Sequence, residues 1–444
     1  MRDLVMFFIV LGWVPMAFMN GFVAFLLWIY TSMLSPQFFL YGFMSGFRYV
    51  FVFAGITLGL MVLGRVKDRG QFIWDKIGVI LVIFIAHALI SALLSINSNP
   101  AVSFRLENFI KGMALALVTP FFLTTRERIH ATLIVVVAGL GFHGVVEGAK
   151  VISSGGAHNI TGIGGATLGD NNLLALGMVM LLPLTLYLAK YSKSQSAKWS
   201  SLGVFVLCVM TVLGSNSRGG FLALFILGVW YWITSPRKLV SAVLVAVVTV
   251  GIVNFAPERW FDRIATIKDA GEDQSFLGRV AAWKVSVNIA NDNPIFGAGF
   301  DAVQVASIWD QYKQKPNFIN IEVPSDIAFK AAHSNYFQVM ADCGYVGLFL
   351  FLALLTAAFI SRWQIKGLVK RLPGDHAWAS DLSTAITLSL VAFMVGGAGV
   401  SLAYFELAYL LIVMISIVLH LLEKKVAATK SAVAMQPGKL VKHA

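Results

Sequence analysis

The chain has 444 residues, of which 58% are hydrophobic and only 13% are charged. Soluble globular domains carry about 25% charged residues, so this composition excludes a soluble globular protein. Lys and Arg outnumber Asp and Glu by 34 to 22, a net charge of +12. In a membrane protein this excess is typical of cytoplasmic loops, and we expect no nucleic-acid partner.

Long apolar runs indicate which kind of membrane protein this is. Residues 79–96 and 202–212 are apolar on every side and do not alternate with period two, which favours helices over a β-barrel. The first apolar run has no small-residue cleavage site, so we expect it to remain as a span. Cys208 and Cys343 suggest neither a disulfide framework nor a zinc site. The predicted fold class is an all-α polytopic integral membrane protein.

Short basic segments set the orientation of the chain, because cytoplasmic loops carry an excess of Lys and Arg. They are Arg65–Lys76, Arg126–Arg128, Lys190–Lys198, Arg237–Lys238, Arg362–Arg371 and the region after Glu423. The runs between them predict crossings at about 48–64, 77–97, 107–123, 130–150, 171–189, 200–217, 219–234, 239–255, 336–360, 380–397 and 403–422. Every basic segment then falls on the same side of the membrane.

The topology of residues 4–34 does not follow from the basic segments alone. Residues 4–34 contain Pro15, Asn20 and Gly21, which can break a helix. To keep the tail after Glu423 in the cytoplasm, we predict one broken crossing here with a cytoplasmic N-terminus, which gives about twelve transmembrane helices.

The predicted crossings divide the chain into four parts. These are N-terminal transmembrane helices at 1–255, a long periplasmic loop with short helices at 256–335, C-terminal transmembrane helices at 336–422 and a basic cytoplasmic tail at 423–444. Arg48, Arg105 and Arg218 then face the periplasm together with the long loop. Within that loop, we expect an apolar side that dips into the membrane interface, formed by Trp260, Phe261, Phe276, Trp283, Ile308 and Trp309.

His333 is the first candidate for chemistry. It lies in His333-Ser334-Asn335-Tyr336, between the long polar loop and a predicted span. A histidine changes charge near neutral pH and can accept a proton from a hydroxyl group. The alternative is a histidine that caps the helix or lies at the interface without a chemical role. Asp342 and the following glycines favour the chemical interpretation.

Arginines form the second group, because arginine at membrane depth is unfavourable unless it faces a polar cavity or an anion. Arg218 lies between two apolar runs, and Arg279 precedes Trp283 by about one helical turn, so that the two share a helix face. With Arg48, these arginines would suit a diphosphate, which guanidinium groups bind through paired hydrogen bonds. The alternative for Arg218 is extension to the lipid headgroups. We expect no catalytic metal and no cofactor.

Other ionisable residues fall within or at the ends of the predicted spans: His87, Lys111, His143, Glu147 and Glu406. They could belong to a proton path, but they show no repeated arrangement across two halves. We therefore favour structural hydrogen bonding for them.

Several segments resemble the O-antigen ligase and polymerase superfamily of bacterial inner-membrane glycosyltransferases. The resemblance lies in Gly278-Arg279 with Trp283, in the run Asn293 to Phe300 (NPIFGAGF), and in His333-Ser334-Asn335-Tyr336 followed by Asp342, Gly344 and Gly347. Asp170-Asn171-Asn172, Ser217-Arg218-Gly219-Gly220 and the single long outer loop support it. Asp342 stands where we would expect Glu.

Within this superfamily the chain looks most like the O-antigen ligases. The resemblance implies a GT-C-like architecture and transfer of polysaccharide from undecaprenyl diphosphate to a sugar hydroxyl of lipid A-core, at the periplasmic face of the bacterial inner membrane. The transfer would be metal-independent and inverting, and membrane lipids would be further partners. His333 would be the base, and Arg218 and Arg279 would hold the diphosphate. Substrate binding would involve Arg48, Arg105, Trp283, Asn335 and Tyr336.

Three other functions fit part of these observations. An O-antigen polymerase or a protein O-oligosaccharyltransferase would use the same lipid-linked donor, and one sequence does not reveal the acceptor. A secondary transporter would also have many spans, but transporters are commonly built from two related halves. The one long loop before the last three predicted spans has no counterpart in the first half, which argues against transport.

Overall fold

A computed structural model describes residues 1–96, 101–234, 238–239, 274–323 and 327–434. These residues form helices and loops, with no β-strand among them. Residues 240–255 of one predicted span, residues 256–273 of the long loop and residues 435–444 of the tail lie outside the described part. The helices are α1 (Arg2–Met19), α2 (Gly21–Leu34), η1 (Pro36–Phe39), α3 (Tyr49–Val62), α4 (Lys76–Leu93), α5 (Ala101–Phe122), α6 (Arg126–Ser153), α7 (Asn171–Lys190), α8 (Gln195–Gly214), α9 (Arg218–Thr234), α12 (Gln274–Asp292), η2 (Ala302–Gln304), α13 (Ala306–Tyr312), α14 (Asn335–Val369), α15 (Ala377–Gly396) and α16 (Glu406–Ala434).

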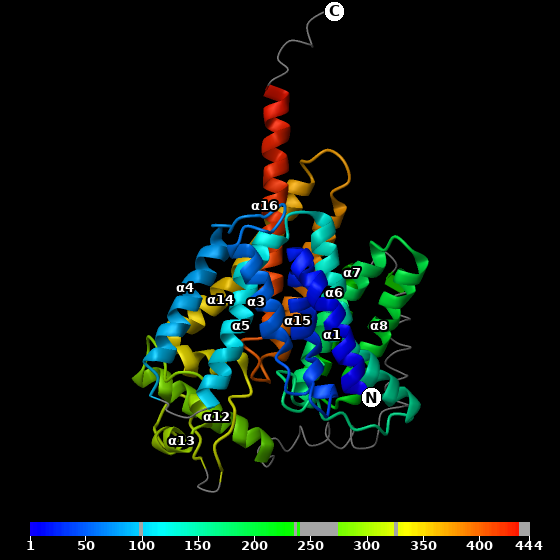
Figure 1. The fold of residues 1–444 in the computed structure, drawn as a ribbon. Helices are drawn as coiled ribbons and strands as arrows, with labels where there is room; N and C mark the ends of the chain where they lie inside the picture. Colours follow the sequence, from blue (N-terminus) through cyan, green and yellow to red (C-terminus); the bar gives the residue numbers. More distant parts are fainter. Residues whose placement is uncertain (97–100, 235–237, 240–273, 324–326, 435–444) are drawn as a thin grey trace, which may run out of the picture.

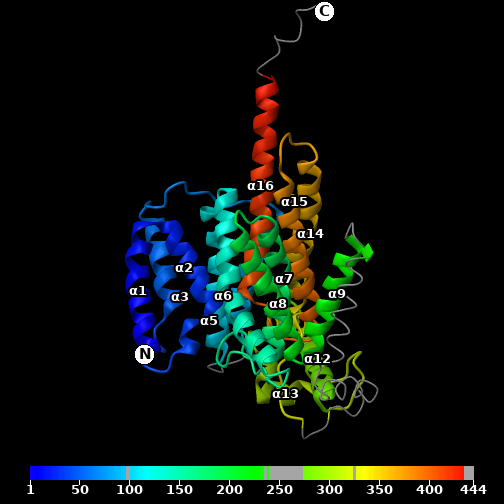
Figure 2. The ribbon, with the colours of Figure 1, turned by 90° about the vertical axis from the view of Figure 1, so that its right-hand side faces the viewer.

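The long helices form one bundle. Eight described helices, namely α1, α4, α6, α7, α8, α14, α15 and α16, are long and apolar enough to cross a membrane, and α2, α3 and α9 are apolar but shorter. Of an apolar 18-residue stretch in each helix, 83% of residues are buried in α7 and 78% in α16, but only 11% in α1. Helices α7 and α16 therefore lie at the centre of the bundle and α1 at its edge. Figure 2 shows α1, α2 and α3 at one side of the bundle and α9 at the other. The polytopic helical fold is thereby confirmed.

Basic segments gather at one end of the bundle. Arg128 donates to the carbonyl oxygen of Asp68 at 3.2 Å, and Lys190 pairs with Asp381 at 2.6 Å. We call this end, formed by residues 63–75, 123–128, 190–198 and 370–376, the basic end. The opposite end carries α12 and α13, and Figure 1 shows both at the bottom with α16 rising at the top. We call it the α12 end.

The first 34 residues form a hairpin of two helices, so the prediction of a single broken crossing is wrong. Asn20 leaves the helical conformation and its side chain caps α2 by accepting from the Phe22 amide at 2.9 Å. This turn lies at the basic end, because a Cβ on Gly21 would be 3.1 Å from Val66. Asp3 accepts hydrogen bonds from backbone amides of the loop after α2. The N-terminus is therefore at the α12 end (Figure 1), and not at the basic end with α16.

The described part of the long loop has its own hydrophobic core. Ala282, Val285 and Ile289 of α12 pack against Ile308 and Trp309 of α13. Ile308 is 5% and Trp309 is 1% exposed, so these two residues do not form a face that dips into the membrane, as the sequence led us to expect. The physical reason is that α13 is amphipathic and its apolar side meets the alanine-rich side of α12.

A break divides α14 where it enters the bundle. Gly344 has φ 69° and ψ −173°, so the helix is interrupted between Asn335–Cys343 and Tyr345–Val369. The loop after α12 fills the break, because the amides of Ala298 and Gly299 donate to the carbonyls of Ala341 and Asp342 at 2.8 and 3.0 Å. Backbone groups that the interrupted helix cannot pair are thus satisfied by the loop.

Candidate functional site

His333 lies in a strained turn just before α14. Its φ is 46°, in the left-handed region that is unfavourable for residues other than glycine. Two hydrogen bonds fix the backbone on either side of it. The indole Nε1 of Trp283 donates to the carbonyl of Ala332 at 2.8 Å, and the amide of Asn335 donates to the carbonyl of Gly397 at 2.7 Å. Strain held in place by its surroundings is common at functional sites.

Charged groups surround the imidazole of His333. Burial lowers its pKa below the ordinary histidine value, and the positive charges of Arg279 and Lys330 lower it further. Asp170 acts in the opposite direction and raises the pKa. The net direction is down, so the ring is neutral over a wider pH range than a free histidine. A neutral imidazole is the form that accepts a proton.

Arg218 is brought to the same region by neighbouring turns. It begins α9, and a Cβ on the adjacent Gly219 would lie 3.5 Å from the carbonyl oxygen of Gly396, at the end of α15. The next residue, Gly397, holds the amide of Asn335. The chain at Arg218 and the chain at His333 therefore both approach the turn that follows α15.

Asn335 and Tyr336, predicted to bind substrate, use their side chains within the protein. Asn335 is 1% exposed and its Oδ1 accepts from the amide of Leu402 at 2.7 Å. The hydroxyl of Tyr336 donates to the carbonyl of Met394 at 2.8 Å. Both residues tie the start of α14 to the end of α15 and the loop that follows. These hydrogen bonds hold the backbone that follows His333, so Asn335 and Tyr336 are suited to position its imidazole.

Arg105 and Arg48 lie elsewhere at the α12 end. Arg105 pairs with Asp301 at 2.7 Å, and the amide of Asp301 donates to the buried carboxylate of Asp342 at 3.0 Å. Arg48 lies over the ring of Phe51 at 5.4 Å. In the described part of the chain, no contact connects Arg48 or Arg105 with His333.

A polar stripe on α4 supports the break in α14. His87 Nε2 lies 2.9 Å from the carbonyl of Cys343, and Ser91 Oγ lies 2.5 Å from that of Asp342. Ser95, one turn further, donates to the carbonyl of Ala298 at 2.9 Å. Because a carbonyl only accepts, Nε2 of His87 carries the proton. The spacing of four residues puts all three side chains on one helix face. From the sequence we expected structural hydrogen bonding for His87 but missed Ser91 and Ser95, which this four-residue spacing could have revealed.

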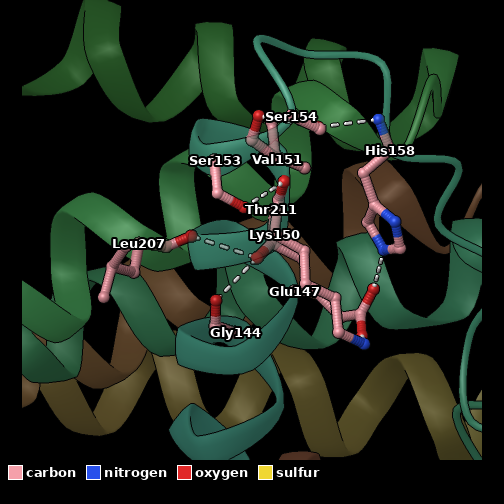
Figure 3. A network of polar contacts seen from close by, with 9 residues as sticks. All are labelled: Gly144, Glu147, Lys150, Val151, Ser153, Ser154, His158, Leu207 and Thr211. Carbon is pink, nitrogen blue, oxygen red and sulfur yellow. Dashed lines mark hydrogen bonds and ion pairs between the residues drawn. The ribbon is translucent and has the colours of Figure 1, made fainter.

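Figure 3 shows a second polar network, where α6 ends. Glu147 accepts from Lys150 at 2.6 Å and lies 2.7 Å from Nε2 of His158, while Thr211 of α8 donates to the carbonyl of Gly144 at 2.8 Å. The network holds the loop after α6 and the neighbouring α8 in place. Three other ionisable residues of the spans are also paired, as predicted: His87 with Cys343, Lys111 with Glu107, and Glu406 with Ser32. His143 differs from the prediction, because its Nε2 is buried with no hydrogen-bond partner among the described residues.

Comparison with families of known proteins gives two matches. Residues 1–193 match a family of unknown function, DUF5935, and residues 203–352 match the O-antigen ligase family. No curated protein matches the chain. The second match contains Arg218, Arg279 and His333, the residues around which the site is built. Over residues 203–352, this match supports the resemblance to the O-antigen ligase and polymerase superfamily.

Proposed function

We propose that this protein is an O-antigen ligase. It would transfer a polysaccharide from undecaprenyl diphosphate to a sugar hydroxyl of lipid A-core, at the periplasmic face of the bacterial inner membrane and within a GT-C-like helical fold. The observation that carries the proposal is the strained turn at His333, whose imidazole pKa is lowered by burial and by the charge of Arg279, inside the segment that matches the O-antigen ligase family. Under this proposal the α12 end faces the periplasm and the basic end faces the cytoplasm.

The proposed reaction is a single displacement. The acceptor hydroxyl oxygen attacks the anomeric carbon, and its proton passes to the imidazole of His333. The bond between the anomeric carbon and the phosphate oxygen breaks, and its electron pair remains on the departing diphosphate. Arg218 and Arg279 stabilise that growing negative charge. Attack from the face opposite the leaving group inverts the anomeric centre.

Replacing His333 with alanine tests the base. In a transfer assay with purified protein, kcat should fall by about 10²–10⁴-fold, the usual contribution of a general base. His158→Ala is the matched control, because His158 lies in the separate network with Glu147. Transfer by His333→Ala within a few-fold of the control would remove His333 from the mechanism. Activity should also survive EDTA, and restoration by Mg²⁺ after a loss in EDTA would contradict a metal-independent reaction.

A gene deletion separates ligase from polymerase. Lipopolysaccharide from the deletion strain, run on a gel and blotted for the glycan, should show core without any glycan while long glycan accumulates on the carrier lipid. A core that carries a single repeat unit would instead identify a polymerase. The residues of the site would then serve chain extension, with the same donor.

A further inference from the structure

The segment that leads to His333 crosses the first turns of α12. A Cβ on Gly278 would lie 2.6 Å from Nζ of Lys330 and 2.9 Å from its Cδ. Five residues along α12, Trp283 donates to the carbonyl of Ala332. The segment is therefore held along α12 at two points. The absence of a side chain on Gly278 leaves room for the stem of Lys330, and its ammonium group lies beside the residue that precedes Arg279.

Lys330 differs from the other lysines of this region in its partners. Lys313 pairs with Asp310 at 2.6 Å, and Lys315 pairs with Asp292 at 2.5 Å. Within the part of the chain that the structure describes, no carboxylate lies at ion-pair distance from Lys330. Lys330 lies near the site, since its charge acts on His333 together with those of Arg279 and Asp170. Because Lys330 is half-buried and forms no ion pair among the described residues, its positive charge favours an anionic ligand.

We propose that Lys330 is a third cation for the diphosphate of the donor, beside Arg218 and Arg279. This inference rests on the proposed function. A diphosphate joined to lipid and sugar carries two negative charges. When the bond to the anomeric carbon breaks, the departing diphosphate gains a third. A third cation at this place stabilises the charge that appears during the reaction, and such an interaction raises kcat more than it lowers KM.

Lys330→Met, which keeps the stem and removes the charge, tests this role. We expect kcat to fall about tenfold or more with a smaller change in KM for the donor, because one preorganised donor to a developing anion contributes up to about 10²–10³-fold. Lys330→Arg should retain most of the activity. Gly278→Ala should resemble Lys330→Met, since the new Cβ displaces the lysine stem. Lys313→Met is the matched control, because Lys313 is already paired with Asp310.

Two further readouts distinguish a charge effect from a loss of structure. Lys330→Met should weaken competitive inhibition by inorganic pyrophosphate several-fold, with little effect on inhibition by inorganic phosphate. It should also move the acidic limb of the pH–rate profile to higher pH, because the positive charge that lowers the pKa of His333 is gone. A folded variant with disturbed packing alone would not produce this pH shift.

The outcomes separate the inference from the proposed function. If the wild type transfers glycan and Lys330→Met matches Lys313→Met in kcat and in pyrophosphate inhibition, Lys330 is not a diphosphate ligand. If the wild type transfers no glycan to any acceptor, the proposed function fails, and direct pyrophosphate binding to the purified protein decides the role of Lys330. Weaker binding by Lys330→Met than by Lys313→Met would support a diphosphate site, whereas equal binding would overturn it.

Discussion

Replacing Gly344 with alanine tests whether the break in α14 needs glycine. The φ of 69° and ψ of −173° at this position are almost confined to glycine, and a side chain there adds about 1–3 kcal/mol of strain. A Cβ would also lie 2.6 Å from the carbonyl oxygen of Ile295 and 2.7 Å from that of Pro294. Both oxygens belong to the backbone, so the overlap can be relieved only if the 293–300 loop moves.

That movement would weaken the hydrogen bond from the amide of Tyr345 to the carbonyl of Pro294, now 2.9 Å long. We expect Gly344→Ala to lower the free energy of unfolding by about 2–4 kcal/mol, from strain and the lost hydrogen bond together. Gly367 lies in the same helix, and a Cβ there would meet no atom within 4 Å. Gly367→Ala should therefore raise the free energy of unfolding by about 0.5–1 kcal/mol, through helix propensity alone.

Unfolding of both variants in detergent micelles with increasing SDS, followed by circular dichroism, measures these changes. The control shows that the assay detects a glycine substitution in this helix. If Gly344→Ala unfolds within about 0.5 kcal/mol of the wild type, the interruption does not depend on glycine and the reasoning fails. The hydrogen bonds from the loop would then be sufficient to break the helix.

Three further predictions concern the surroundings of the site. Trp283→Phe keeps an aromatic ring but removes the donor to the carbonyl of the buried Ala332. The free energy of unfolding should fall by about 1–3 kcal/mol, and kcat of the folded variant should fall about tenfold in the transfer assay. Burial and the nearby arginine lower the pKa of His333. As the pH is lowered, kcat/KM should therefore stay level to a pH below the ordinary histidine pKa of about 6.5. A decline that begins near pH ~8 would contradict this prediction. Ser91→Ala leaves a carbonyl at the α14 break without its donor and should lower the free energy of unfolding by about 1–3 kcal/mol, whereas the exposed Ser201→Ala should change it by less than about 0.5 kcal/mol.

Hydropathy predicts most of the bundle because a helix in lipid must be apolar along its whole length. It did not predict the N-terminal hairpin. A broken crossing and two short helices have the same apolar residues, and Asn20 is compatible with both. The contacts that decide between them join residues far apart in the sequence, Asp3 with the amide of Gly42 and Gly21 with Val66. Such contacts have no signature in local composition.

The sequence indicated residue types for the proposed site but not their partners. His333 and Arg279 are the types that glycan transfer would require under the proposed function, and the structure brings Arg279 close enough for its charge to lower the pKa of the His333 imidazole. Lys330 gave no signal, because its position depends on how the segment before α14 crosses Gly278. Arg105 was predicted to bind substrate but is paired with Asp301. A single sequence shows which arginines exist but not which carboxylates fold against them.

The motifs that carry the resemblance divide into two physical roles. A Cβ on Gly297 would lie 2.5 Å from the carbonyl oxygen of Ala341, while one on Gly344 would meet the carbonyl of Ile295. Each glycine therefore faces the backbone of the other motif, and NPIFGAGF together with the Asp342–Gly344 break forms one structural unit. This unit orients the first turns of α14, and it does so without supplying a group that transfers protons or binds phosphate. A related chain could keep the unit and change its chemistry. The proposed activity must therefore be tested at His333, Arg218, Arg279 and Lys330, whose replacement we expect to alter the reaction without disrupting this structural unit.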